Sequence, residues 1–569
     1  MPPNASREAP PASPSPSRRP QWWRWGEGGI VWSAERLDRL RDYLEHRLGA
    51  PSGGPLPAPV PLSSLHFPPS RLREDELAEL RQSLSLGAVS VEGEERLVHS
   101  VGRGYLDLLD LRSGKVGQYT DAVVHPATAE EVVAVLRFAE AHDLAVIPYG
   151  GGTSPTGGID PNPGGHRGVI TLSLGRLIDP LGLDSTSALA RFQAGIRGPE
   201  LEKSLRAEGF TLAFFPGSFE HTTLGGWIAT GRGSDAVGRD REIRHLVRGL
   251  TVATPRGVLK LDSLSDTVPG PDPAGLFVGS EGTLGVIVEA SVAVHRQPGA
   301  SAYRASLYPD WASGLEAVRT LAQGPTRPSL LRLLDAAATE VLLECRRADP
   351  GLGARVRERL EPRFLEMRHL EEGTMTLALQ GWQGSEAQIS EGERRAREVR
   401  REFKGVDLGT PSPDLWQQER FAFAHLQEEM LEQGWFVDRL ETNAAWSELT
   451  PLALSVPTAI AEEARRGQWA LLVTTALSHA STTGATLHFR LYSPQDPKDP
   501  ALQARRLLDA GARALREGHA SLGCSEGVGT RWRAELALDR AGAPLELLRA
   551  VKQSLDPKGI LNPGKMLPP

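Results

Sequence analysis

Residues 144–154 read Leu-Ala-Val-Ile-Pro-Tyr-Gly-Gly-Gly-Thr-Ser, an apolar strand that runs directly into three glycines. Consecutive glycines tolerate positive φ and carry no Cβ, so their backbone N–H groups can converge on one anion. Thr153 and Ser154 add hydroxyl donors to the same turn. The spacing fits neither the P-loop nor the G-x-G-x-x-G fingerprint. We predict a phosphate-binding loop at Gly150, Gly151, Gly152, Thr153 and Ser154, entered from Pro148. A plain flexible loop is the alternative.

The residues around this loop alternate between strand and helix patterns. A short strand is expected at 123–126 and a buried strand at 144–148. Between them Thr128 opens an amphipathic helix, with Glu131 three residues later as in a capping box. Further strands are expected at 168–174, 249–254 and 285–295. These patterns predict one domain of mixed helices and strands over residues 119–298.

Two further segments of this domain are rich in glycine and hydroxyl side chains. The first holds Phe215-Pro216-Gly217-Ser218 and then Thr222-Thr223-Leu224-Gly225-Gly226-Trp227-Ile228-Ala229-Thr230. A purely flexible loop would not carry such large apolar residues, whereas a segment wrapped around a cofactor needs close backbone approach and neutral donors. The second holds Gly279-Ser280-Glu281-Gly282-Thr283-Leu284-Gly285-Val286-Ile287, expected between strands at 276–278 and 285–295. Its glycines suggest backbone packed against a flat ligand.

The rest of the chain divides by composition. Residues 1–20 are Pro-rich and predicted to be a flexible tail, and residues 21–118 an N-terminal helical segment with helices at 33–48 and 73–84. Residues 299–520 are predicted to form a second α+β domain, and residues 521–569 a segment that packs back on the first domain. The second domain has helical patterns at 311–322, 394–403, 458–466 and 503–517, and strand patterns at 302–308, 374–380, 470–477 and 485–492.

An aromatic cluster, Trp22-Trp23-Arg24-Trp25-Gly26, follows the Pro-rich tail abruptly. One interpretation is a plug that docks the N-terminus on the body of the protein. The other is a direct role near the active site.

The bulk composition excludes several classes of protein. The chain has 569 residues, a formal net charge of −7 and two cysteines, Cys345 and Cys524. An acidic balance argues against a nucleic-acid binder, and two cysteines cannot build a disulfide framework or a cysteine metal site. No long apolar run or secretory signal is found, so we expect a cytoplasmic protein. We also expect no bound metal.

The three glycine-rich segments, in this order, resemble the FAD-binding domain of the vanillyl-alcohol oxidase and p-cresol methylhydroxylase flavoproteins. The closing stretch 556–565, Asp-Pro-Lys-Gly-Ile-Leu-Asn-Pro-Gly-Lys, is similar to the end of the same group. Within that group the chain resembles the alkyldihydroxyacetonephosphate synthase family. That likeness rests on residues 22–26, 222–230 and 254–257, on Leu331-Arg332-Leu333-Leu334-Asp335, and on Leu440-Glu441-Thr442 with Trp446.

The resemblance implies an α+β fold in which two subdomains hold FAD and a cap domain, 299–520, covers the flavin ring. It also implies the FAD-binding residues Pro148, Gly150, Gly151, Gly152, Thr153, Ser154, Pro216, Gly217, Ser218, Thr222, Thr223, Gly225, Gly226, Ala229, Thr230, Glu281, Gly282, Gly285 and Ile287. Some relatives attach FAD to a histidine in the glycine loop. Because Thr153 stands there, we expect non-covalent FAD.

The activity implied is the exchange of the acyl chain of acyl-dihydroxyacetone phosphate for a fatty alcohol, with FAD as a covalent catalyst and no net redox change. The implied partners are a lipid-like phosphorylated substrate and a fatty alcohol, with no nucleic acid. The resemblance is also compatible with peripheral contact with a membrane and with a homodimer.

The implied catalytic residues are Arg332, His479, Ser481 and Glu526. Arg332 matches a family arginine suited to the phosphate, and an ion pair with Asp335 is its structural alternative. Either His479 or His488 could act as a base, although a lone histidine is often structural.

Three places in the sequence, five residues in all, depart from the family pattern. Cys524-Ser525-Glu526 replaces a run of three histidines, Ser481 replaces a tyrosine, and Gln427 replaces an arginine. These losses remove a phenol for proton transfer and a bidentate phosphate partner. Two alternatives to the synthase therefore stay open: a catalytically degenerate flavin-binding protein, and an FAD-dependent 2-hydroxy-acid oxidoreductase.

Overall fold

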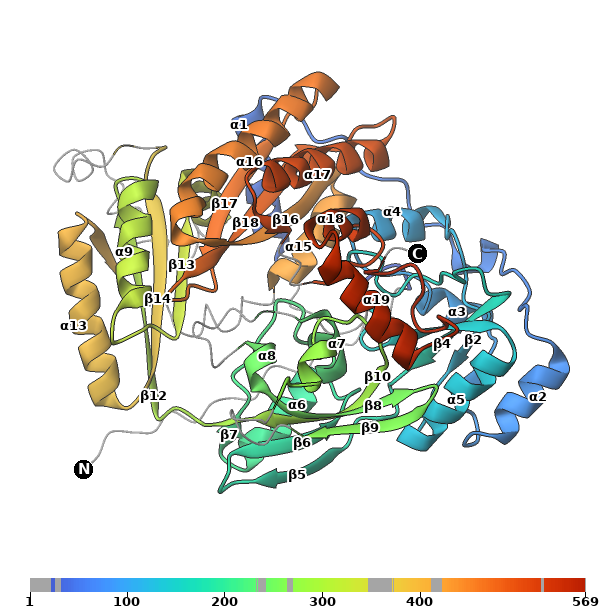
Figure 1. The fold of residues 1–569 in the computed structure, drawn as a ribbon. Coiled ribbons are helices and arrows are strands. Elements are labelled where there is room, and N and C mark those ends of the chain that lie inside the picture. Colours follow the sequence, from blue (N-terminus) through green and yellow to red (C-terminus); the bar gives the residue numbers. More distant parts are fainter. Residues whose placement is uncertain are drawn as a thin grey trace.

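The computed structural model describes residues 22–25, 32–231, 233, 242–262, 270–345, 371, 373–410, 422–522 and 526–567. The Pro-rich tail at 1–20, together with Gly26, Cys524 and Ser525, lies outside these residues. Within them the chain forms three main sheets, with helices packed on their faces (Figure 1).

The strand that leads into the glycine loop is the edge of a four-stranded sheet. Its order is β1-β2-β4-β3, with β2 and β3 both parallel to β4 and β1 antiparallel to β2. The strands are β1 (Val89–Ser90), β2 (Ala122–Val124), β3 (Leu144–Tyr149) and β4 (Gly168–Ser173). Helix α5 (Ala129–Ala141) connects β2 to β3, as the sequence predicts.

The N-terminus of α5 differs in one detail from the predicted capping box. Thr128 Oγ1 accepts the N–H of Glu131 at 3.2 Å, as expected. The Glu131 carboxylate instead accepts the N–H groups of Ala127 and Ser85, at 2.6 and 2.7 Å. The glutamate therefore ties the helix to the N-terminal segment instead of closing the box, because Ser85 lies within its reach.

A five-stranded antiparallel sheet forms the second half of this domain. Its order is β5-β6-β10-β8-β9. The strands are β5 (Pro180–Asp184), β6 (Leu189–Gln193), β8 (Val247–Thr254), β9 (Gly257–Asp262) and β10 (Val286–Ala293). The nearby helices are α6 (Gly198–Ala207), α7 (Leu224–Thr230) and α8 (Ile243–Leu246), with a small pair of strands, β7 (Phe210–Thr211) and β11 (His295–Arg296). One apolar core joins this sheet to the four-stranded sheet.

The strand predicted at 276–278 is wrong. Residues Ala274–Leu276 form a 3-10 helix, and a turn follows through Gly279. The apolar side chain of Phe277 is buried in the core from this helical turn, so burial alone explains the apolar pattern without a strand.

The second α+β domain is built on an eight-stranded antiparallel sheet, of order β15-β12-β14-β13-β17-β18-β16-β19. Its strands are β12 (Ala300–Tyr308), β13 (Leu330–Leu334), β14 (Thr376–Gly384), β15 (Val406–Gly409), β16 (Trp435–Ala445), β17 (Leu472–Ser478), β18 (Gly484–Pro494) and β19 (Ser521–Leu522). One face packs on α9 (Trp311–Gln323), α13 (Glu386–Glu402), α16 (Trp446–Gly467) and α17 (Pro500–Glu517). The other face, near β16, packs on α1 (Ala34–Leu48), α10 (Ala336–Cys345) and α15 (Ala422–Glu432).

The N-terminal segment is shared between the two domains. Helix α1 packs on α10 of the second domain, while β1 extends the four-stranded sheet of the first. Helix α2 (Glu74–Gln82) lies between α1 and β1 in the chain, and α3 (Gly93–Val98) and α4 (Tyr105–Ser113) follow β1. The N-terminal segment therefore contacts both domains.

The C-terminal segment returns to the first domain. It contains α18 (Arg533–Asp539) and α19 (Ala543–Leu555), and Val551 and Leu555 of α19 pack against the core of the first domain (Figure 1). Beyond α19, Leu561 forms a parallel bridge with Val146 of β3. The last described residues thus run alongside the strand that carries the glycine loop.

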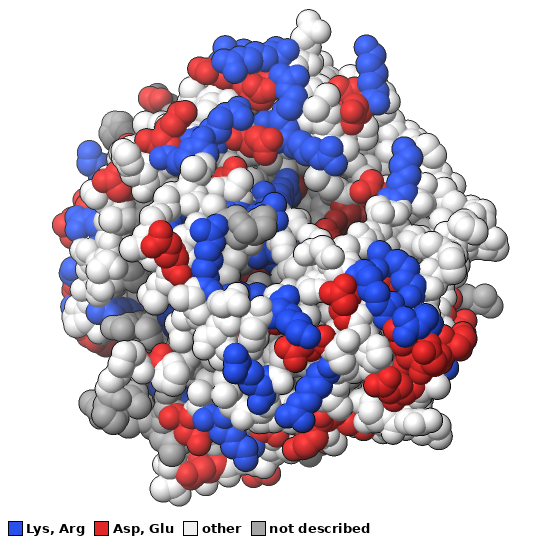
Figure 2. All heavy atoms as spheres, turned by 45° about the vertical axis from the view of Figure 1, so that its right-hand side comes forward, with Lys and Arg blue, Asp and Glu red and all other residues white. Residues whose placement is uncertain are grey.

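Acidic and basic side chains are mixed on the molecular face in Figure 2, with no broad area of one sign. None of the described helices is long and apolar enough to span a lipid bilayer.

Candidate active site

A cleft opens where the glycine loop, α7 and the loop before β10 meet. It encloses about 880 Å³ of space outside the atoms, counting the open solvent at its mouth. The predicted residues that line it are Pro148, Gly150, Gly151, Gly152, Thr153, Ser154, Thr222, Thr223, Gly225, Gly226, Ala229, Thr230, Glu281, Gly282, Gly285, Ile287 and Glu526.

The glycine loop is held too tightly for any side chain. A Cβ on Gly151 would lie 2.0 Å from the carbonyl oxygen of His221, and one on Gly150 would lie 2.5 Å from Thr223 Oγ1. Gly152 has a φ of 71°, in the left-handed region. No hydrogen bond among the described residues takes up the backbone N–H groups of residues 150–154. This run of unused donors at the cleft fits a pyrophosphate.

Helix α7 separates its apolar and small residues onto two faces. Leu224, Trp227 and Ile228 are buried in the core, with Trp227 also donating to Thr222 Oγ1 at 2.6 Å. The small residues Gly225, Gly226, Ala229 and Thr230 line the cleft. Thr223 caps the helix by accepting the N–H of Gly226 at 3.2 Å. The mixture of glycine and large apolar residues is thus explained by one face that packs and another that lets a ligand approach.

The Glu281 side chain binds the backbone of the C-terminal segment. Its buried carboxylate accepts the N–H groups of Val528 and Gly529 at 2.5 and 2.8 Å, and burial raises its pKa. Its carbonyl oxygen accepts Asn562 Nδ2 at 2.7 Å, and the same amide donates to the carbonyl of Gly158 at 3.0 Å. Glu281 therefore holds residues 528–529 through its carboxylate, and Asn562 through its carbonyl oxygen, beside the cleft.

Three predicted FAD-binding residues are not brought to this cleft. Pro216, Gly217 and Ser218 lie in the turn that follows β7, outside the cleft lining, and a Cβ on Gly217 would meet no atom within 4 Å. Their role stays a prediction. The other lining residues, which were not predicted to bind FAD, are Tyr149, Gly158, Ile159, Leu174, Trp227 and Val286. Tyr149, Trp227 and Val286 lie within the quoted motifs, whereas no sequence signal marked Gly158, Ile159 and Leu174.

The four predicted catalytic residues have different surroundings. Glu526 lines the cleft, and Arg332 is half-buried on β13. Ser481 Oγ donates to the carbonyl of Gly484 at 2.9 Å, so this hydroxyl stabilises its own turn. Gln427, which stands for the family arginine, likewise donates to a backbone carbonyl, that of Val437, at 2.9 Å.

Asp335, the predicted ion-pair partner of Arg332 in the structural alternative, accepts two backbone hydrogen bonds. The Asp335 carboxylate accepts the N–H groups of Ala338 and Thr475, at 2.7 and 2.6 Å. It thus caps α10 and joins it to β17. Burial raises the pKa of this carboxyl to about 6.

His479 is the end of a hydrogen-bonded row on the second domain's sheet. Ser478 Oγ lies 2.6 Å from His479 Nδ1 and 2.6 Å from His488 Nε2. His488 Nδ1 lies 3.2 Å from the Glu441 carboxylate. Arg439 joins Glu441, at 3.2 Å, to Glu526 at the cleft. The row thus runs from the cleft lining to His479.

The sheet register explains this row. Glu441 lies opposite His488, and Arg439 opposite Arg490, so their side chains share one face. Leu333 lies opposite Leu477, which places Arg332 beside Ser478 on that same face. The alternate residues Leu477, Leu487 and Phe489 face the helices and are buried. The sheet therefore presents a polar row on one side and an apolar core on the other.

The row fixes which ring nitrogen carries a proton. An ionised Glu441 favours a proton on His488 Nδ1, so His488 Nε2 accepts the Ser478 hydroxyl. The Ser478 oxygen then accepts His479 Nδ1–H. A Cβ on Gly233, two residues beyond the end-cap of α7, would lie 3.0 Å from His479 Nε2. The His479 ring thus lies beside the segment that follows α7.

Comparison with known proteins gives two family matches and several relatives. Residues 120–262 match the FAD binding domain, and residues 297–566 match the C-terminal domain of FAD linked oxidases. An alkyldihydroxyacetonephosphate synthase from Trypanosoma brucei brucei is 28% identical over 88% of this chain and 82% of its own. One from Dictyostelium discoideum is 25% identical over 94% and 88%.

A solved structure of an alkyldihydroxyacetonephosphate synthase superposes with a TM-score of 0.80 and 23% identity. It covers 93% of this chain and 92% of its own. This similarity supports the fold alone. The predicted α+β fold class, with an FAD-binding domain and a second α+β domain, is confirmed.

Proposed function

Because the chain is a flavoprotein that joins an FAD binding domain to the C-terminal domain of FAD linked oxidases, we propose that it is an FAD-dependent alkyldihydroxyacetonephosphate synthase. It exchanges the acyl chain of acyl-dihydroxyacetone phosphate for a fatty alcohol. The observation that carries this proposal is that the likeness to the named synthases runs through both domains, over 88% and 94% of the chain.

The described cleft fits FAD. The unused N–H groups of residues 150–154 take the pyrophosphate, and the small residues of α7 let the cofactor lie close to the backbone. Thr153 cannot form the histidine linkage of some relatives, so FAD is held non-covalently. When bound, FAD supplies the electron-poor ring on which the exchange depends.

His479 is the proposed base. The exchange needs a proton removed from the substrate and one supplied to the leaving acid. His479 takes the first, and the Ser478–His488–Glu441 row stabilises the charge that results. This row supplies in another form the proton transfer that the tyrosine would provide in the family.

Arg332 is the proposed partner of the substrate phosphate. It lies on the same sheet face as Ser478, and guanidinium groups bind phosphate oxygens in pairs. Arg439 is bound by Glu441 and Glu526, so its charge is already balanced.

The test is an exchange assay on the FAD-loaded chain with palmitoyl-dihydroxyacetone phosphate and hexadecanol. We expect alkyl-dihydroxyacetone phosphate and palmitate in equal amounts, without net bleaching of the flavin. His479→Asn should lower kcat by at least a hundredfold while the flavin spectrum is retained. Bleaching by D-lactate or another 2-hydroxy acid under anaerobic conditions, without exchange, would instead identify an oxidoreductase. FAD binding with neither reaction would identify a degenerate flavoprotein.

A further inference from the structure

A second group of side chains meets next to the cleft and is not used by the proposed reaction. Glu220 and His221 lie just before Thr222 and Thr223 of the cleft, and His425 lies on α15 of the second domain. Their potential ligand atoms all lie within 4.8 Å of one another. The group thus joins the two domains at one point.

Three side-chain polar atoms of this group have no partner among the described residues. Glu220 Oε2, His221 Nε2 and His425 Nε2 are all shielded from solvent and make no hydrogen bond. The side chain of His425 is only 9% exposed. A buried polar atom without a partner costs about 1 to 3 kcal/mol, so three in one place point to a ligand that they share.

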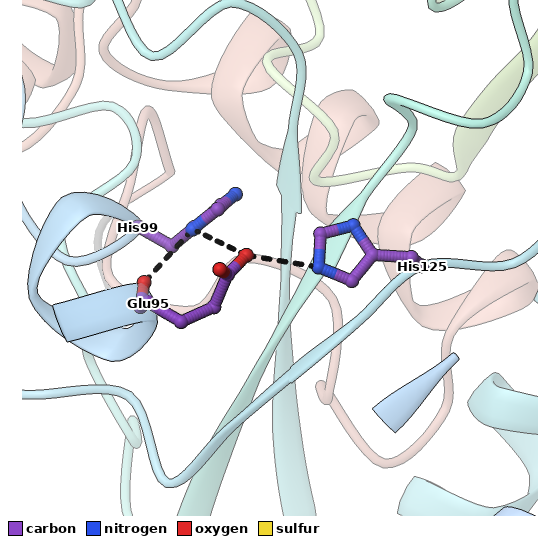
Figure 3. A group of neighbouring side chains, drawn as sticks. All are labelled: Glu95, His99 and His125. Carbon is purple, nitrogen blue, oxygen red and sulfur yellow. Dashed lines mark hydrogen bonds and ion pairs between the residues drawn. The ribbon is translucent and has the colours of Figure 1, made fainter. Parts of the chain in front are cut away.

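A similar trio elsewhere shows the contrast. Figure 3 shows Glu95, His99 and His125, whose side chains also converge. There, His125 Nε2 lies 3.1 Å from Glu95 Oε1, and His99 Nδ1 lies 2.9 Å from the Glu95 carbonyl oxygen. The Glu95 trio is thus satisfied by its own hydrogen bonds, and the Glu220 group is not.

The charge state of the Glu220 group suits a cation. Burial lowers the pKa of both His221 and His425 to about 4, so each offers a neutral ring with a free lone pair at neutral pH. Burial alone raises the pKa of Glu220. A divalent cation would stabilise its ionised form and occupy both ring nitrogens.

The neighbouring guanidinium groups limit what else can bind there. Arg103 and Arg197 act on His221, and Arg24 acts on His425. Arg24 is paired with Glu428 at 2.9 Å, so its charge is largely balanced. One carboxylate leaves a bound divalent ion with a net positive charge, and the remaining guanidinium groups favour an anionic oxygen or water as its fourth ligand.

The aromatic cluster near the N-terminus closes this place from solvent. The Trp25 ring centroid lies 5.8 Å from that of His221 and 6.1 Å from that of His425. Arg24 and the N–H of Trp25 hold this segment on Glu428 of α15. These contacts fit the interpretation that the aromatic cluster docks the N-terminus on the body of the protein. Trp25 docks against His221 and His425.

We propose that Glu220, His221 and His425 bind one divalent cation of borderline softness, such as Zn²⁺, beneath Trp25. Two imidazoles and one carboxylate with an open fourth position are a usual zinc donor set. The ion would fasten α15 of the second domain to the loop that enters the FAD cleft.

The test uses the FAD-loaded full chain, incubated with zinc chloride, passed over a desalting column with a weak chelator, and measured for zinc by mass spectrometry. We expect about one zinc per chain in the unaltered protein, and under about a tenth of that in His425→Ala and Glu220→Gln. His125→Ala, in the Glu95 trio, is the matched control and should keep the full amount. Retained flavin absorbance shows that each variant is folded.

Cobalt gives a second measurement that needs no variant. Co²⁺ in the same site should give visible d–d absorption that titrates to about one ion per chain and is removed by added zinc. Zinc below a tenth of an equivalent in the unaltered chain overturns the proposal. So does an equal zinc content in His425→Ala, or loss of zinc in His125→Ala alone. None of these outcomes depends on the exchange reaction.

Discussion

At the scale of single residues, the proposed chemistry depends on one serine. Ser478 is the only hydroxyl in the described row that lies within 2.6 Å of both imidazoles. Its hydrogen can point to one ring only, so it couples the protonation of His488 to that of His479. From the sequence, His479 and His488 are simply two histidines nine residues apart. The hydrogen bond between Ser478 and His488 could not be predicted, because it forms only when β17 pairs with β18.

Ser478→Ala tests this coupling. Without the hydroxyl, His479 loses the acceptor that fixes its Nδ1 proton, so kcat should fall by roughly a hundredfold with little change in KM. Ser478→Thr keeps a hydroxyl and should recover most of the rate. Steady-state kinetics of the exchange would measure both variants. Equal activity in Ser478→Ala and the unaltered chain would show that the row is structural.

Asp335 should make stability depend on pH. Its pKa is raised from 3.8 to about 6 by burial, so the stability it contributes is present below about pH 4 and is lost as the pH rises through 6. The loss in free energy of unfolding is up to about 3 kcal/mol. Asp335→Asn stays neutral, so it should flatten the curve between pH 4 and 6. Urea unfolding at several pH values measures this, and parallel curves for the two proteins would contradict it.

At the scale of elements, the sequence predicts segments well where one face is apolar. The helix opened by Thr128, the strand at 144–148 and the helices at 311–322 and 503–517 all form near the expected residues. Strand β16 was not predicted, although Arg439 and Glu441 alternate with apolar residues as in a half-buried strand. In the fold Arg439 is paired with Glu441 and with Glu526.

The glycine loop gives a prediction at this scale. Gly151→Ala places a methyl group 2.0 Å from the His221 carbonyl oxygen, so the loop must move and FAD should be lost. Gly217→Ala is the matched control, because a Cβ there meets no atom within 4 Å. Flavin absorbance after purification compares them. Loss of FAD in Gly217→Ala would instead support the sequence prediction for residues 216–218.

At the scale of the whole molecule, the site is assembled from parts that the sequence keeps far apart. The predicted cleft residues come from three motifs within one domain, and sixteen of the nineteen FAD-binding predictions lie together. The group of Glu220, His221 and His425 could not be predicted, because it exists only once α15 docks on the first domain. Contacts between domains leave no periodic pattern in the sequence.

The tail provides a prediction for the whole fold. Asn562→Gly removes the two hydrogen bonds that Nδ2 donates to the carbonyl groups of Gly158 and Glu281. Glycine tolerates the left-handed backbone at this position, where φ is 39°. We expect a loss of about 2 kcal/mol in the free energy of unfolding and faster FAD release. Asn562→Ala should lose about 1 kcal/mol more, since its Cβ opposes that φ. Thermal and urea unfolding, with flavin fluorescence for release, would measure these changes. Unchanged FAD release would show that the tail does not hold the cleft.

The bridge between Leu561 and Val146 has a consequence for biosynthesis. Strand β3 leaves the ribosome long before Leu561, which bridges to it. The neighbouring hydrogen bond from Asn562 to Gly158 likewise joins residues 404 apart in sequence. A nascent chain therefore carries the glycine loop on an open sheet edge while the whole second domain is still being made. Stable capture of the cofactor must wait for residues 556–567, so chains stalled before them should emerge without flavin and prone to aggregate.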